Sequence, residues 1–152
     1  MLKYILLGVL LVAITVVIHA LGTTSWLRHL GRLYGDATKT DRPAPSLRIL
    51  INTIIVLTIL HTIQVIVWAL AFLYLLPENV LHTFEEASYF SFVTFTTLGY
   101  GDISFTGVWR ILSGIEALNG VLLIGWSTAL LFVVVQRIMK DMLQRGADKI
   151  TN

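Results

Sequence analysis

Three long apolar stretches constrain this chain more than any other feature, and they cover residues 4–21, 49–76 and 108–135. Each is long enough to cross about 30 Å of hydrocarbon as a helix that rises about 1.5 Å per residue. Of the 152 residues, 56% are apolar and 13% are charged, a balance that a soluble domain of this size could not hide in one core. The sequence therefore predicts an all-α membrane protein with three transmembrane helices.

Nine of the eleven Lys and Arg residues gather in two places outside these stretches: between the first two, and after the third. They are Arg28, Arg32, Lys39, Arg42 and Arg48, then Arg137, Lys140, Arg145 and Lys149. Cytoplasmic segments of membrane proteins are enriched in Lys and Arg. We therefore expect a protein of the plasma or inner membrane, with residues 23–46 and the C-terminal tail in the cytoplasm, and with the N-terminus and residues 77–107 on the outer side. A cleaved secretory signal is the alternative for the first stretch, but its removal would leave a basic segment at the new terminus.

The connection after the first stretch contains both cap and break signals. We expect Gly22 to close a first helix over 1–22, and residues 23–25 to cap a short helix over 26–34 that lies on the membrane surface. An ordinary basic loop is the alternative. Pro43 and Pro45 then end this linker, residues 23–46, before a second span over 47–76 that stops at Pro77.

A short helix is predicted next, because Thr83-Phe84-Glu85-Glu86 has the form of a capping box. A helix over 83–96 is roughly 20 Å long, which is too short to cross a membrane. We interpret it as re-entrant. Irregular backbone at membrane depth requires protein or a water-filled path around it, so the glycine-containing stretch that follows must line a pore or be buried.

That stretch, residues 97–101, reads Thr-Leu-Gly-Tyr-Gly and is followed by Asp102. It resembles the filter of the potassium-channel pore family, usually Thr-Val-Gly-Tyr-Gly followed by Asp, and the resemblance extends over about residues 47–137. It implies an outer helix (47–76), a pore helix (83–96), a filter (97–101), an inner helix (107–137) and a short tail (138–152). It also implies a fourfold-symmetric homotetramer.

The residue types of the filter suit potassium binding. Rings of carbonyl oxygens replace the hydration shell of the ion if successive carbonyls face one axis. Glycine adopts positive φ at little cost, so Gly99 and Gly101 allow the carbonyls of Thr97, Leu98, Gly99 and Tyr100 to face the same way, and the Thr97 hydroxyl adds an innermost ring. Permeant potassium ions are the expected ligands, with no cofactor.

Several side chains are expected to support the filter, among them Thr96 at the end of the pore helix. Certain relatives pair a glutamate with the aspartate at position 102, whereas this chain has Val93 at the matching place. We expect Asp102 either to accept a hydrogen bond from Tyr89 or to be solvated at the mouth. Glu116 either supports the filter from behind, or is protonated, or makes a structural hydrogen bond to the re-entrant helix.

The third span contains candidates for a cavity and a gate. Gly120 lies near the family's hinge position, and Gly114 and Gly125 also weaken the helix, so they mark either a hinge or close helix packing. Asn119 is expected to face the cavity, and residues 130–134 to close the path by dewetting. His61 and Gln64 in the second span are expected to meet Thr15 or His19, as interhelical hydrogen bonds or as a proton sensor.

These features favour passive, selective potassium conduction by a homotetramer in contact with membrane lipids. The second span has no arginine repeat of a voltage sensor, and the tail is too small for a large ligand-binding domain. No catalytic constellation is present, so an enzyme is not expected, nor is a nucleic-acid partner. A weakly selective channel and a non-conducting regulatory membrane subunit are the alternatives.

Overall fold

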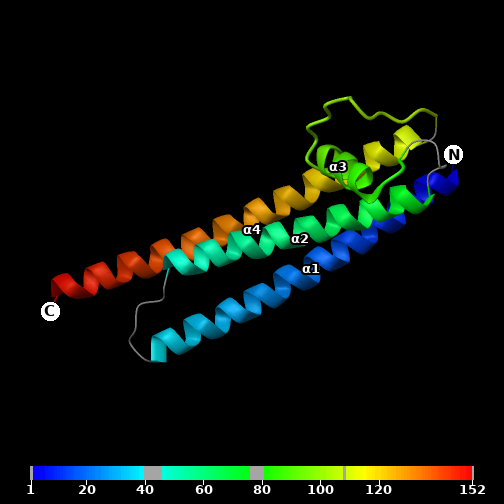
Figure 1. The fold of residues 1–152 in the computed structure, drawn as a ribbon. Coiled ribbons are helices and arrows are strands. Elements are labelled where there is room, and N and C mark those ends of the chain that lie inside the picture. The colour runs from blue at the N-terminus through cyan, green and yellow to red at the C-terminus, as the bar shows by residue number, and fades with distance from the viewer. Residues whose placement is uncertain (1, 40–45, 76–80, 108, 152) are drawn as a thin grey trace.

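The computed structural model describes residues 2–39, 46–75, 81–107 and 109–151, with side chains described for 2–32, 47–75, 81–107 and 109–144. In these residues the chain forms four helices: α1 (Leu2–Lys39), α2 (Ser46–Leu75), α3 (Phe84–Phe95) and α4 (Trp109–Thr151). The long helices α1, α2 and α4 run side by side, and α3 lies beside α2 and α4 at the end where the N-terminus is found (Figure 1).

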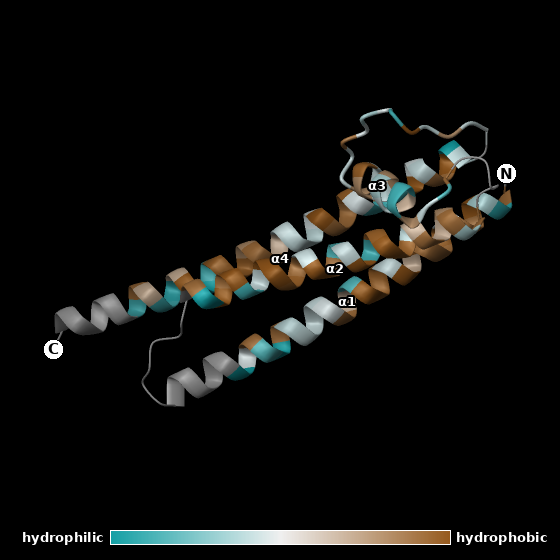
Figure 2. Ribbon diagram, in the orientation of Figure 1, coloured by the Kyte–Doolittle hydropathy of each residue, from teal (hydrophilic) through white to brown (hydrophobic). Residues whose placement is uncertain are grey.

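The three long helices contain segments that are long and apolar enough to cross a membrane: Leu2–Arg32, Leu47–Leu75 and Trp109–Gln144. Hydrophobic residues cover most of α2 and the middle of α4 (Figure 2). The chain is thus an all-α, multi-pass membrane protein with three candidate spans, in agreement with the hydropathy of the sequence.

Two apolar clusters hold the long helices together, one near each end. The cluster beside α3 is aromatic: Phe72, Phe90 and Phe105 have ring centroids 4.3–5.4 Å apart, and Trp68 and Phe95 are buried with them. The other cluster is aliphatic and joins α1, α2 and α4 through Leu30, Ile49, Leu57, Leu60, Leu130, Val134 and Ile138. Between them lies a layer of buried polar side chains: Thr15, His19, Gln64, Asn119 and Ser127.

The expected helix break at Gly22 is wrong, because α1 continues without interruption from Leu2 to Lys39. A Cβ at Gly22 would collide with the side chain of Leu60, so this glycine lets α1 approach α2 closely. The Thr23 hydroxyl donates back to the His19 carbonyl at 2.7 Å instead of capping a new helix. The separate helix over 26–34, and the alternative of a loop there, are both replaced by this extension of α1.

The other predicted boundaries agree with the structure to within two residues, except at the end of the inner helix. α2 begins at Ser46, and α4 begins at Trp109 and runs to Thr151, so the expected tail over 138–152 is helical as far as Thr151. Pro43, Pro45 and Pro77, which were expected to break the chain, lie outside the described residues.

Candidate functional site

Helix α3 begins with a complete capping box, as the sequence predicts. Thr83 at the N-cap accepts a hydrogen bond from the Glu86 backbone N–H at 3.1 Å, and the Glu86 carboxylate accepts one from the Thr83 N–H at 3.3 Å. The same carboxylate accepts a bond from the His82 N–H at 2.7 Å. With twelve residues, α3 spans about 18 Å and is too short to cross a membrane.

The chain leaves α3 through a tight turn. The Thr96 N–H donates to the Phe92 carbonyl at 3.1 Å, and the Thr97 N–H donates to the Thr94 carbonyl at 2.9 Å. A third bond, 3.3 Å long, joins the Gly99 N–H to the Val93 carbonyl. These bonds hold the start of the Thr-Leu-Gly-Tyr-Gly segment against the C-terminal end of α3, where the helix dipole is partially negative and favours a cation.

The backbone of this segment enters the left-handed region at alternate residues. The φ angles are 60° at Thr97, 57° at Gly99 and 80° at Gly101. The positive φ predicted for the two glycines is confirmed, whereas the left-handed Thr97, which costs roughly 1–2 kcal/mol in a residue with a Cβ, was not foreseen. Alternation of this kind interrupts ordinary strand geometry, in which carbonyls point in opposite directions along the chain.

The same segment has few neighbours within its own chain. A Cβ at Gly99 or Gly101 would have open space around it, and the side chains of Leu98 and Tyr100 are 60% and 68% exposed. Apart from the bond between the Gly99 N–H and the Val93 carbonyl, residues 98–101 thus make few contacts with the protomer that carries them. Irregular backbone in this position needs further protein or a water-filled path around it.

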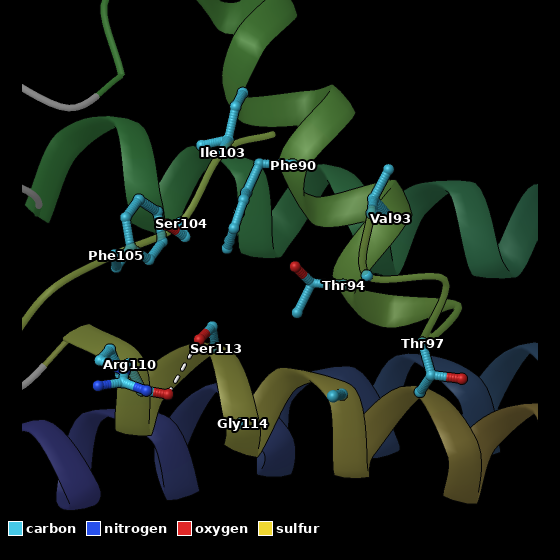
Figure 3. Close-up of a pocket in the computed structure, with 12 residues that line it drawn as sticks. Phe90, Val93, Thr94, Thr97, Ile103, Ser104, Phe105, Arg110, Ser113 and Gly114 are labelled. Atoms are coloured by element: carbon cyan, nitrogen blue, oxygen red, sulfur yellow. Dashed lines mark hydrogen bonds between the residues drawn. The ribbon is translucent and has the colours of Figure 1, made fainter. Parts of the chain in front are cut away.

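A cavity of about 400 Å³ lies behind the segment, between α3, α4 and the loop that returns to α4. Phe90, Val93 and Thr94 line it from α3, and Arg110, Ser113 and Gly114 line it from α4 (Figure 3). The wall from α3 is mostly apolar. The Ser113 hydroxyl is bonded to the Arg110 carbonyl at 2.9 Å.

Asp102 accepts a hydrogen bond from the Tyr89 hydroxyl at 2.7 Å, which confirms the expected contact between the end of the segment and α3. This bond lowers the pKa of the Asp102 carboxyl, because it favours the charged form of the acceptor, and it raises the pKa of Tyr89. Val93 is 9% exposed at the position where relatives place a glutamate. A neutral side-chain donor therefore holds Asp102, and the backbone N–H groups of Asp102 and Ile103 also favour its charged form.

Of the three glycines of α4 that the sequence singles out, Gly120 makes the closest contact. A Cβ there would collide with the backbone carbonyl of Phe95 in the last turn of α3. Gly114 and Gly125 have open space at the Cβ position. The structure therefore gives Gly120 a packing role, and Gly125 is the better of the predicted hinge positions.

Two polar residues of α4 face the protein interior. Asn119 is 1% exposed and donates to the Thr15 hydroxyl of α1 at 2.8 Å, so the expectation that it faces a cavity is wrong. Glu116 is fully buried, and its carboxyl group lies beside the Ser91 side chain of α3. The structure thus brings Glu116 to α3, the element to which a structural hydrogen bond is expected.

His61 and Gln64 of α2 meet α1 as expected, but through His19 rather than Thr15. The Gln64 amide lies 2.9 Å from His19 Nδ1, and His61 Nδ1 lies 3.1 Å from Gln64 Oε1. Ser127 of α4 joins both histidines and was not singled out from the sequence. The sequence spacing could have indicated Ser127, because it follows Asn119 by eight residues and so lies on the same face of the helix.

The candidate gate residues divide between two faces of α4. Leu130 and Val134 are buried against α1 and α2 in the aliphatic cluster, so they are not free to close a path. Phe132 and Val133 are 61% and 56% exposed. Leu131 is half-buried, so it and the exposed pair remain available for the dewetting role predicted for residues 130–134.

A family model described as an ion channel matches residues 55–137, which is more than half of the chain. The match contains α3, the Thr-Leu-Gly-Tyr-Gly segment and large parts of α2 and α4, and it is consistent with a potassium-channel pore module. No curated protein and no solved structure matches the chain. From the family match over these residues we conclude that the chain belongs to this ion channel family and is a channel protein rather than an enzyme.

Proposed function

We propose that this chain is the subunit of a potassium-selective channel and that Thr97, Leu98, Gly99, Tyr100 and Gly101 form its selectivity filter. The observation that carries the proposal is the alternation of left-handed residues at Thr97, Gly99 and Gly101 directly after α3. With such an alternation, successive backbone carbonyls can be turned toward one axis, where they replace the hydration shell of a potassium ion. The ions pass down their electrochemical gradient, and no cofactor takes part.

The proposed channel is a homotetramer. One chain supplies one filter strand, so complete rings of carbonyl oxygens require a symmetric assembly. The exposed Leu98 and Tyr100 and the open cavity between α3 and α4 are consistent with contacts from neighbouring copies. Three further identical subunits, membrane lipids and potassium are the proposed partners.

The proposed orientation places the N-terminus outside and the C-terminus in the cytoplasm. Figure 1 places α3 and its loop at the N-terminal end of α1, whereas Arg28, Arg32, Arg137 and Lys140 belong to the opposite ends of α1 and α4. Because positive residues favour the cytoplasmic side, the filter then opens to the outside. The outer helix has no Lys or Arg between 49 and 75, so we propose that the chain has no voltage sensor of its own.

The test is flux of potassium and sodium through purified protein in liposomes, with barium as a blocker. The wild type should conduct potassium far better than sodium, and barium should block it. Gly99→Asp should abolish the flux, because its side chain would stand in the filter at a left-handed position. Gly31→Asp is the matched control, since Gly31 has open space on α1 far from the filter, and its flux should be unchanged.

Equal flux of sodium and potassium would replace the proposal with a weakly selective channel. Liposomes that stay tight under voltage, low pH and membrane tension would favour the non-conducting regulatory subunit.

A further inference from the structure

A closed ring of four side chains lies in the polar layer between the two apolar clusters. It runs from Gln64 Nε2 to His19 Nδ1 (2.9 Å), from His19 Nε2 to Ser127 Oγ (3.3 Å), from Ser127 Oγ to His61 Nε2 (2.9 Å) and from His61 Nδ1 to Gln64 Oε1 (3.1 Å). The ring joins all three long helices, because His19 is in α1, Ser127 is in α4 and the other two residues are in α2.

A count of the hydrogens shows that this ring can close with both imidazoles neutral. Four contacts need four hydrogens, one in each. The amide donates to one histidine and accepts from the other, the hydroxyl supplies one hydrogen, and each neutral imidazole donates through one nitrogen and accepts through the other. All four bonds therefore close with both imidazoles neutral, and they do so whichever way the Gln64 amide is turned.

An added proton disturbs this closure. An imidazolium brings a fifth hydrogen to four contacts, so either the Ser127 hydroxyl turns out of the ring and Ser127 Oγ accepts from both imidazoles, or two donors face each other across one contact. In the first case the hydroxyl hydrogen loses its partner in the ring, in the second a contact is lost, and in both cases the ring gains a charge in a region of low dielectric.

The surroundings of the ring supply no countercharge among the described residues. Two of the groups beside it are aromatic: the centroid of the Phe95 ring of α3 lies 5.9 Å from that of His61, and the centroid of the Trp126 ring of α4 lies 5.4 Å from that of His19. α2 has no acidic residue, and α1 has none before position 36. Glu116 of α4 is eleven residues from Ser127, about 16 Å along the helix axis.

Protons can reach the ring through a groove of about 160 Å³ between α2 and α4. His61 and Ser127 line it together with Thr58 and Thr128, and its remaining walls are aliphatic. This volume admits several water molecules, each of which takes about 30 Å³ in the liquid, and the hydroxyl groups give them partners.

The position of the ring on α4 gives it a mechanical consequence. Ser127 follows Gly125 by two residues, and Gly125 has open space at its Cβ position, so α4 is locally weak where the ring restrains it. We propose that the His19–Gln64–His61–Ser127 ring is a proton-operated restraint: with both histidines neutral it holds α4 to α1 and α2 beside Gly125, and proton binding releases α4 there.

The test measures the separation of α1 and α4 in the full-length protein in liposomes. The chain has no cysteine, so Leu27→Cys and Met139→Cys, at two exposed positions, introduce a pair of spin labels, with labelled chains diluted by unlabelled ones. We expect one narrow distance distribution at pH 8 and a second, longer component that grows as the pH is lowered to 4. An unchanged distribution between pH 8 and pH 4 would overturn the proposal.

Three variants separate a proton-operated ring from ordinary helix packing. His19→Gln combined with His61→Gln should lose the pH response, whereas His29→Gln, an exposed histidine stacked on Trp26, should keep it. Gln64→Glu should keep the short distance at pH 4, because a carboxylate that accepts from both imidazoles supplies the countercharge and lets the ring close with one of them protonated and the Ser127 hydroxyl in place. A longer component that persists in the double variant would also overturn the proposal.

The effect on conduction is a separate readout that rests on the proposed function. If the chain conducts potassium, release of α4 at pH 4 should raise the flux at least twofold over pH 8, and the double variant should abolish this rise. A pH-dependent distance without any potassium flux would refute the proposed conduction and leave the restraint in place. The wild-type distance measurement needs no substitution in the ring, so it decides the proposal even if the double variant does not fold.

Discussion

The Thr-Leu-Gly-Tyr-Gly segment and the polar layer between the helices satisfy their polar groups in opposite ways. The segment leaves its glycines open and its side chains exposed, so its backbone is complete only with other molecules around it. The four residues of the ring, in contrast, are joined side chain to side chain within one chain. The comparison teaches that the proposed filter depends on assembly, whereas the contact of α1 with the pore helices is a property of the single protomer.

The largest effect on stability is expected at Gly120, which follows Asn119 of the polar layer and packs against the last turn of α3, just before the Thr-Leu-Gly-Tyr-Gly segment. Gly120→Ala places a Cβ against the Phe95 carbonyl, a backbone atom that cannot rotate away, so it should lower the free energy of unfolding by roughly 2 kcal/mol and weaken potassium flux. Thermal unfolding of the detergent-solubilised protein measures the first effect and liposome flux the second.

Gly125→Ala is the matched control in the same helix, because its Cβ would meet open space. Its free energy of unfolding should stay within about 1 kcal/mol of the wild-type value, since alanine meets no neighbour there and forms helices better than glycine does. Equal losses in both variants would contradict the packing role of Gly120 and remove its link between α3 and α4.

A smaller effect is expected for the bond between Asn119 and Thr15, which belongs to the internally satisfied region. Asn119→Leu and Thr15→Val should each destabilise the protein, and a double-mutant cycle should give a coupling of about 0.6 kcal/mol, as for other hydrogen bonds between membrane helices. Thr58→Val, whose hydroxyl bonds only within α2, serves as the control partner and should show no coupling to Asn119→Leu. A coupling of zero for Thr15 would mean that α1 is held by apolar contacts alone.

The smallest effect is expected at the outer end of the filter segment, for Tyr89→Phe. Removal of the hydroxyl should raise the pKa of Asp102 toward the ordinary aspartate value, as measured by a carbon-13 titration of its carboxyl. Because the pKa is lowered in the folded protein, the contribution of this bond is present above about pH 4 and is lost as the pH falls through the lowered value.

The control for that measurement is Tyr74→Phe, since Tyr74 is 76% exposed on α2 and away from Asp102. It should leave the titration of Asp102 unchanged. A titration that is the same in Tyr89→Phe and the wild type would show that solvent, rather than Tyr89, determines the charge of Asp102, and would make the filter segment still more dependent on its surroundings.

Much of this fold follows from local sequence. Length and hydropathy determine the three spans, the Thr83–Glu86 capping box determines the start of α3, and glycine at 99 and 101 allows positive φ, because each of these depends on a few neighbouring residues. The family match agrees with the motif and adds that the chain is an ion channel protein. Potassium selectivity, the tetramer and the orientation stay predictions.

Only the tertiary structure decided which residues meet across the helices. Gly22 was expected to end a helix because glycine often does so. In the structure α1 continues through Gly22, where the absence of a side chain makes room for Leu60 of α2. Asn119 was expected in a cavity because polar groups in spans usually face water, but α1 provides Thr15 as its partner. The pattern of a helix shows which residues share a face, whereas the neighbour opposite that face is set by the packing of segments far apart in the chain.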